Sequence, residues 1–330
     1  MIQIAVVFIG LSLLLYVLLG GADFGAGIIE IFTGKKGINT ISKAVAPVWE
    51  ANHIWLIVVI VVMFNAFPEV YSVIMLYLHI PIMMVLFGII FRGTAFTFRY
   101  YDPYEDRSHD IYTLIFKIFS LLTPFFLGVT LGAVIMGNIT TSPDGSFYER
   151  FVMPWLHLFP ISLGIFVVLL FAFLAAVYLA GEPSPEETGA QFIRYSKRLL
   201  LSLVIAGITV FLVAEFSGHH LLRSFLHSWL SLVCMGLATV LLPVFLYALN
   251  HRKSNLTRLA AGAQTGAILT GWFAAQFPTL IALKDAAPLT IYNAAAPHRS
   301  VLLVVIALFT GLALVIPLLI YLFKIFKFSD

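Results

Sequence analysis

Long apolar runs recur from one end of the chain to the other, and they limit the possible folds more than any other feature. A helix that spans a membrane needs about 20 apolar residues, because each residue adds only about 1.5 Å of rise across roughly 30 Å of hydrocarbon. The segments that meet this requirement are Ile4 to Ile31, Val48 to Phe67, Tyr71 to Phe91, Ile111 to Gly137, Pro154 to Ala180, Leu199 to Phe216, Phe225 to Leu249, Leu256 to Leu280 and Val301 to Phe326. The sequence therefore predicts an all-α integral membrane protein with nine transmembrane helices, forming a single polytopic membrane domain over residues 1–330.

The composition excludes an ordinary soluble protein. Apolar residues make up 61% of the chain and charged residues 11%, whereas a soluble domain carries roughly 25% charged residues. The net charge of +3 is small and does not indicate a nucleic-acid partner. The single cysteine, Cys234, excludes an internal disulfide framework and a dithiol redox site.

The basic residues predict how the chain is oriented in the membrane. Short connections rich in Lys and Arg are retained on the cytoplasmic side. Fourteen of these residues follow the first, third, fifth, seventh and ninth predicted helices, whereas only Arg150, Arg223, Lys284 and Arg299 follow the even-numbered ones. We therefore expect the N-terminus outside and the C-terminus in the cytoplasm.

Asp23 and Glu50 are acidic residues inside predicted helices, where an ionised group is costly unless it is paired, protonated or hydrated. Glu50 lies about one turn into the second predicted helix, and Asp23 lies near the end of the first, within the small-residue segment Gly20 to Gly27. The predicted orientation places both acids at a similar depth near the cytoplasmic side. Such a pair can admit protons, share a proton or bind a cation. The alternative is two interfacial carboxylates that water or the nearby lysines satisfy.

Three other side chains are expected near these acids. His53 lies three positions after Glu50 and shares its helix face, so the two are suited to relay protons near neutral pH. Arg92, at the end of the third predicted helix, either anchors that end at the cytoplasmic surface or fixes a carboxylate such as Glu50. Trp55 is expected to pack within the protein or to anchor its helix at the interface.

Haem ligation must be considered because the chain contains nine histidines. Of these, only His79, eight residues into the third predicted helix, is expected deep in the membrane. One deep histidine does not make a bis-histidine site, although a nearby methionine is a possible second ligand. We expect His79 to be a hydrogen-bonded core residue, and we predict no metal site in this chain.

Several segments together resemble a known family. They are Gly21-Ala22-Asp23-Phe24-Gly25-Ala26-Gly27, Pro47-Val48-Trp49-Glu50-Ala51-Asn52-His53-Ile54-Trp55, Phe67-Pro68-Glu69-Val70-Tyr71, Phe91-Arg92-Gly93 and Leu289-Thr290-Ile291-Tyr292-Asn293-Ala294-Ala295. In their order and spacing they resemble subunit II of the cytochrome bd-type quinol oxidases.

The resemblance implies two four-helix bundles plus one peripheral helix, in the cytoplasmic membrane of a bacterium or archaeon. It implies a partner, subunit I, that holds two haems b and one haem d. The complex would oxidise quinol and reduce O2 to water, generating a proton gradient without a pump. This chain would scaffold subunit I and take up protons from the cytoplasm without binding a cofactor of its own. Lipid, quinone and a small single-helix accessory subunit are further partners of such a complex.

The resemblance also implies roles for individual residues. Glu50 and Asp23 correspond to acids on the cytoplasmic proton route, with His53 beside them, and Trp55 corresponds to an aromatic residue near a hydrophobic oxygen path. No catalytic residue is expected in this chain.

Two other functions remain open from the sequence. A proton-coupled secondary transporter would use the same acids for substrate coupling, although such transporters tend to have internal repeats and broken helices at the midplane. A haem-bearing cytochrome would hold haem on this chain itself.

Overall fold

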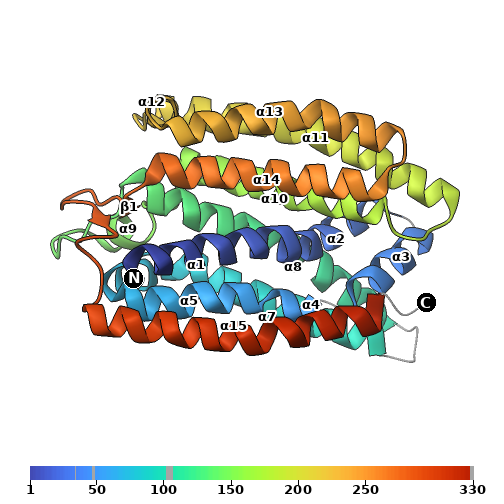
Figure 1. Ribbon diagram of the computed structural model, residues 1–330, viewed down its shortest axis with the longest axis horizontal. Helices are drawn as coiled ribbons and strands as arrows, with labels where there is room; N and C mark the ends of the chain where they lie inside the picture. The colour runs from blue at the N-terminus through green and yellow to red at the C-terminus, as the bar shows by residue number, and fades with distance from the viewer. Residues whose placement is uncertain (34, 47–48, 102–106, 328–330) are drawn as a thin grey trace.

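The computed structural model describes residues 1–33, 35–46, 49–101 and 107–327, and these residues are predominantly helical (Figure 1). The long helices are α1 (Ile2–Leu15), α2 (Gly21–Ile31), α5 (Ile54–Ala66), α7 (His79–Tyr101), α8 (Arg107–Met136), α10 (Leu158–Leu179), α11 (Glu186–Phe216), α13 (Trp229–Asn250), α14 (Ser254–Gln276) and α15 (His298–Lys327). The shorter elements are the π-helical turn η1 (Tyr16–Gly20), α3 (Lys35–Val45), α4 (Trp49–Asn52), α6 (Pro68–Tyr77), α9 (Phe147–Phe151), α12 (Leu221–His227), and the antiparallel strands β1 (Thr279–Ile281) and β2 (Leu289–Thr290).

Eight helices in the described parts of the chain are long and apolar enough to span a membrane. They correspond to all the predicted spans except Leu256 to Leu280. That segment forms α14, which is as long as the others but more polar. Gln264 of α14 donates to the Ala238 carbonyl, and the Gly271 carbonyl accepts from Ser231, so polar groups of α14 are satisfied by α13. An all-helical, multi-pass membrane protein is confirmed, and the number of nine spans stays a prediction.

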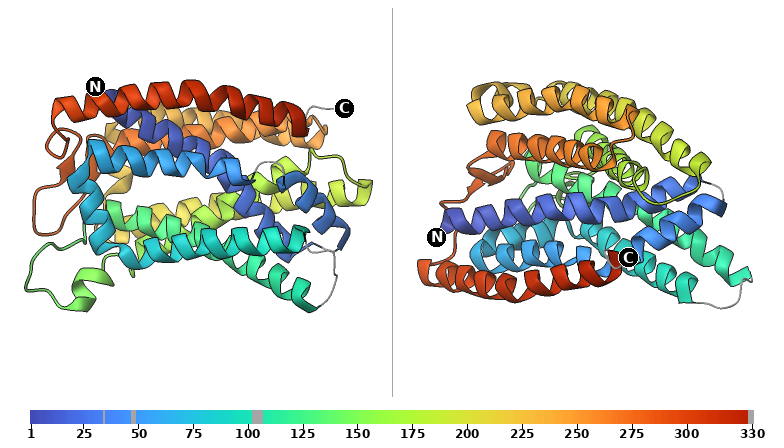
Figure 2. Two further views of the ribbon diagram at one scale, coloured as in Figure 1. Left: turned by 90° about the horizontal axis from the view of Figure 1, so that it is seen from below. Right: turned by 45° about the vertical axis from the view of Figure 1, so that its right-hand side comes forward.

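Helix α10 lies at the centre of the molecule. It contacts α2, α8, α11 and α14, and every residue from Leu170 to Val177 is buried. Helix α15 lies at the edge, where it packs on α1 and α5 (Figures 1 and 2). The grouping of the helices into two four-helix bundles plus a peripheral helix stays a prediction.

The two ends of the molecule differ in charge. One end holds α3 with Lys43, the start of α11 with Arg194, and the turn between α13 and α14 with Arg252 and Lys253 (Figure 1, right). We call this the basic end. The opposite end holds Met1, α9, α12 and the two strands. The charge asymmetry of the sequence is therefore an asymmetry along the helix axes, and the side of the membrane that each end faces stays a prediction.

Several predicted helix boundaries are wrong, and two of the differences have a clear physical reason. The helix predicted over Tyr71 to Phe91 is interrupted at Leu78, where α6 ends and α7 begins. Pro81 explains the break, because proline lacks an amide hydrogen and its ring clashes with the carbonyl four residues earlier in a continuous helix. Helix α11 begins at Glu186, whereas the prediction began it at Leu199. The prediction followed the apolar run, and the first turns of α11 are polar and lie outside that run.

Close packing of α2 on α10 depends on small residues. A Cβ atom at Gly25 would overlap the carbonyl oxygen of Phe171, and one at Gly21 would lie 2.8 Å from the Phe171 ring. The small residues around Asp23 therefore let α10 approach α2 closely. The depth and orientation of Asp23 are therefore set by backbone contact between two helices.

We expect Gly25→Ala to destabilise the protein by about 1–3 kcal/mol, because the added methyl group overlaps a backbone oxygen that can move only with α10. Gly10→Ala is the matched control, since a Cβ there meets no atom within 4 Å. Thermal unfolding of both variants in detergent checks the prediction. Equal unfolding midpoints would contradict the contact between α2 and α10.

Candidate functional site

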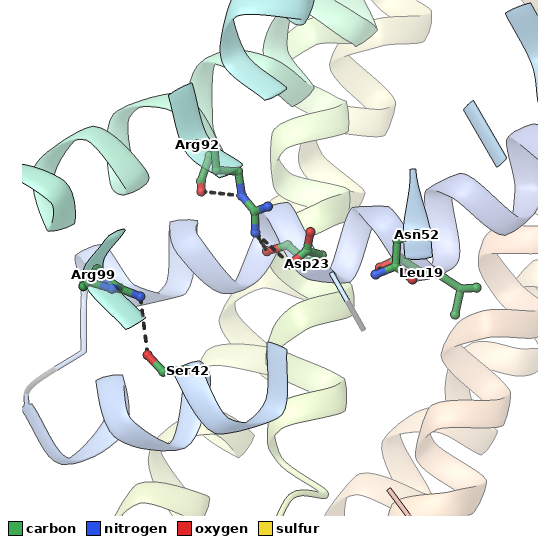
Figure 3. A network of polar contacts seen from close by, with 7 residues as sticks. Leu19, Asp23, Ser42, Asn52, Arg92 and Arg99 are labelled. Carbon is green, nitrogen blue, oxygen red and sulfur yellow. Dashed lines mark hydrogen bonds and ion pairs between the residues drawn. The ribbon is translucent and has the colours of Figure 1, made fainter. Parts of the chain in front are cut away.

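Two buried ion pairs connect α2 with α7. Arg92 Nη2 lies 2.7 Å from Asp23 Oδ1, and Arg99 Nη1 lies 2.6 Å from Glu30 Oε1 (Figure 3 shows the first pair). All four side chains are at most 4% exposed. The two acids are seven residues apart on α2, and the two arginines are seven apart on α7. Seven residues make about two helical turns, so the two pairs lie about two turns apart along both helices.

Aromatic rings from α2 and α8 and a hydroxyl group from α8 complete the surroundings of the arginines. The Phe116 ring lies 4.9 Å from the guanidinium carbon of Arg92 and 4.5 Å from that of Arg99. Arg92 also lies over the Phe24 ring at 4.7 Å, and its Nε donates to Ser120 Oγ at 3.2 Å. Rings in these positions attract a cation through their negative faces. The pairs therefore join α2, α7 and α8 in one buried cluster.

Of the alternatives for Arg92, the structure shows that it binds a carboxylate, and that this carboxylate is Asp23 and not Glu50. Arg92 reaches Asp23 from α7, and its guanidinium donates to both the side chain and the backbone carbonyl of Asp23. The Glu50 side chain is exposed on the one-turn helix α4, toward the basic end. The two acids are thus in different environments: Asp23 is buried and paired, and Glu50 is accessible from outside this chain.

Asp23 shares its surroundings with two other buried polar groups. The His53 ring lies 6.1 Å from the ring of Tyr16 and 5.8 Å from that of Phe24. Tyr16 Oη, His53 Nδ1 and Asp23 Oδ2 are buried and make no hydrogen bond with any described residue. Buried polar atoms are normally hydrogen-bonded. These three atoms are therefore places where water or a transferred proton can be held.

A π-helical turn shapes this region. In η1 the backbone makes an i→i+5 bond from the Gly21 amide to the Tyr16 carbonyl, and such turns are frequent at functional sites. The Leu19 carbonyl accepts a hydrogen bond from Asn52 Nδ2 at 3.3 Å (Figure 3). This bond ties α4, which carries Glu50 and directly precedes His53, to the turn that directly precedes α2 with Asp23.

Trp55 is buried beside an apolar cavity of about 260 Å³. Its lining comes from η1, α4, α5 and α15: Leu19, Ala51, Asn52, Trp55, Ile316, Leu319 and Ile320. Trp55 is therefore a packing residue at the wall of a cavity that suits an apolar molecule. Its expected position next to a hydrophobic path stays a prediction.

His79 does not lie where the sequence places it. Because α7 begins at His79, the residue is at the start of a span and not two turns inside one. Its Nδ1 lies 2.8 Å from the Leu76 carbonyl oxygen, and its ring packs on Phe151 at 5.3 Å. Within residues 1–33, 35–46, 49–101 and 107–327, no three His, Cys, Asp or Glu side chains are grouped as a metal site would require.

Sequence reasoning missed Glu30 and Tyr16. Glu30 follows Asp23 by the same seven residues that separate Arg99 from Arg92, and this repeated spacing was a usable signal for paired helices. Tyr16 offered no such signal, because one tyrosine in an apolar helix is usually a packing residue.

Comparisons with known proteins agree along the whole chain. The profile of the family described as "Cytochrome bd terminal oxidase subunit II" matches residues 1–326. The chain is 25% identical over 335 residues to "Cytochrome bd ubiquinol oxidase subunit 2" of Bacillus subtilis (strain 168), a match that covers 99% of this chain and 94% of that protein. It is 27% identical over 131 residues to "Cytochrome bd-I ubiquinol oxidase subunit 2" of Escherichia coli (strain K12), a match that covers 39% of this chain and 34% of that protein. Among solved structures, a chain of the bd oxidase from Geobacillus thermodenitrificans has the same fold, with a TM-score of 0.81, 18% identity, and coverage of 99% of this chain and 100% of that one.

We expect Arg92→Met to cost about 3–5 kcal/mol of stability, because it leaves the Asp23 carboxylate buried without its cation. Adding Asp23→Leu to this variant should restore much of the loss, since no unpaired charge then remains. Unfolding in detergent measures both effects.

The matched control is Arg252→Met. Arg252 pairs with Glu186 at 3.6 Å with both side chains largely exposed, so its loss should change stability by less than about 1 kcal/mol. An equal loss in the two Arg→Met variants would contradict a structural role for the buried pair.

Proposed function

The chain belongs to the cytochrome bd terminal oxidase subunit II family, and from this membership we propose that it is the second subunit of a quinol oxidase that reduces O2 to water. The match to the Bacillus subtilis protein, named as a ubiquinol oxidase subunit, supports this proposal along 99% of the chain. The complex belongs to a respiratory chain, and its proposed location is the cytoplasmic membrane of a bacterium or archaeon.

The redox centres are proposed to lie in subunit I, as two haems b and one haem d. When bound, these haems carry electrons from quinol and bind oxygen. On this division His79 has a structural role, since its Nδ1 lies 2.8 Å from the Leu76 carbonyl oxygen at the start of α7. Lipid, quinone and a small single-helix subunit are further proposed partners.

The proposed role of this chain is to scaffold subunit I and to take up protons. Reduction of O2 to water consumes one proton for each electron, so the buried site of oxygen reduction needs a route from water. If the basic end faces the cytoplasm, the exposed Glu50 is placed to receive protons there. This step would separate charge across the membrane without a pump.

Asp23 and His53 are the proposed inner groups of this route. Arg92 holds Asp23 Oδ1, so Oδ2 is the atom that accepts the proton. His53, whose Nδ1 is buried and unpartnered in the described structure, follows Glu50 by three residues, and its ring lies 6.1 Å from the ring of Tyr16. The observation that carries the proposal is this unpartnered carboxylate oxygen inside a buried ion pair. A proton-coupled transporter would use the same groups, and isolation of the chain from native membranes without haem or a large partner would favour it.

We expect Glu50→Gln to slow oxygen consumption by the intact complex roughly tenfold or more, because an amide cannot take up and release a proton. The haem spectra should be unchanged, since Glu50 is exposed and holds no other part of the fold. Glu69→Gln is the control, since Glu69 is an exposed acid on α6 at the opposite end. Normal turnover with normal haem spectra in Glu50→Gln would show that the proton role is wrong.

A further inference from the structure

A cavity of about 240 Å³ lies between α2, α3, α10 and α14. Its polar lining includes Asp23, Asn52, Glu182 and Arg258, and most of the remaining wall is apolar. The cavity therefore extends from the buried ion pair on α2 to two charged residues from the second half of the chain.

The outer end of this cavity is an ion pair at the basic end. Arg258 Nη2 lies 2.9 Å from Glu182 Oε1, and the two side chains are 30% and 19% exposed. Glu182 lies in the turn after α10, and Arg258 is held in place because it also donates to the Tyr178 carbonyl at 2.7 Å. The pair is thus partly in contact with the surroundings and partly inside the protein.

Each end of the cavity holds a polar atom without a partner in the described structure. Asp23 Oδ2 at the inner end and Arg258 Nε at the outer end are both buried and make no hydrogen bond there. A cavity can hold ordered water when it is larger than about 15 Å³ and offers several polar partners. The volume of this cavity is many times larger, and its carboxylates, guanidinium and amide provide the partners.

We propose that this cavity is a water-filled inlet that brings protons from the basic end to Asp23, with Glu182 as the carboxylate at its mouth. The inference rests on the proposed function, because it supplies a second approach to the same acid. A proton passes from water to Glu182, then through ordered water to Asp23 Oδ2, and each donor is reprotonated from the outer side. Arg258 is a positioning residue that keeps Glu182 at the mouth.

This inlet is distinct from the approach through Glu50, which does not line the cavity. Asn52 and Leu19 line both this cavity and the apolar cavity beside Trp55, and the two residues are joined by a hydrogen bond (Figure 3). The Asn52 amide therefore forms part of the wall between a space suited to water and a space suited to apolar molecules.

The test is proton uptake by the intact oxidase complex, followed with a pH-sensitive dye during reaction with oxygen, in water and in deuterium oxide. Glu182→Gln should slow uptake roughly tenfold and enlarge the solvent isotope effect, while the haem spectrum stays unchanged. Glu182→Asp should recover part of the rate. The matched control is Glu187→Gln, an exposed acid at the same end that does not line the cavity.

Ala44→Leu keeps the test decisive if the Glu182 variants fail to assemble. Ala44 lines the cavity from α3, so a larger apolar side chain should displace water and slow uptake without changing any charge. Normal uptake in Ala44→Leu and Glu182→Gln, with slow uptake in Glu50→Gln, would overturn the inlet and leave the proposed function standing. Normal uptake in all three would overturn both.

Discussion

The buried ion pairs between α2 and α7 are the interaction on which the rest of this structure depends. A carboxylate inside the membrane region costs several kcal/mol unless a cation and further hydrogen bonds compensate it. Arg92 and Arg99 supply the cations at two levels about two turns apart, and Phe116 of α8 lies against both. Because each acid must meet its own arginine, the pairs fix the register of α2 against α7. The glycine contact with α10 then fixes the same helix from its other side.

The register of α2 determines what Asp23 can do. One oxygen is held by Arg92, and the other remains buried near the rings of Tyr16 and His53, in a side chain that lines a cavity with several polar groups. The exposed Glu50 is connected to this region through α4, whose Asn52 binds the π-helical turn. The two acids that look equivalent in the sequence therefore lie in different environments. The Glu50 side chain is exposed, whereas the Asp23 side chain is buried, paired with Arg92 and part of a cavity wall.

Much of this arrangement could be predicted from the sequence, and the reasons for the failures are physical. Hydropathy identified the apolar spans, because a membrane imposes length and composition directly. It missed the break at Leu78, which depends on Pro81, and it did not separate α14, whose polar groups bind a neighbouring helix. Asp23 was recognised because a charge among apolar residues needs an explanation. Its partner Arg92 was not predicted, because ion pairing across helices depends on how the helices pack. Glu182 and Arg258, which line the same cavity as Asp23, were not predicted either, because they come from segments far away in the chain.

The central claim is that the free oxygen of Asp23 takes up and releases a proton during turnover. The most direct measurement is the infrared difference spectrum of the intact complex between its reduced and oxygen-reacted states, with Asp23→Asn beside the natural chain. The account predicts a band from a protonated carboxyl group that is present in the natural protein and absent from Asp23→Asn. An identical carboxyl spectrum in both would show that Asp23 only holds Arg92 in place.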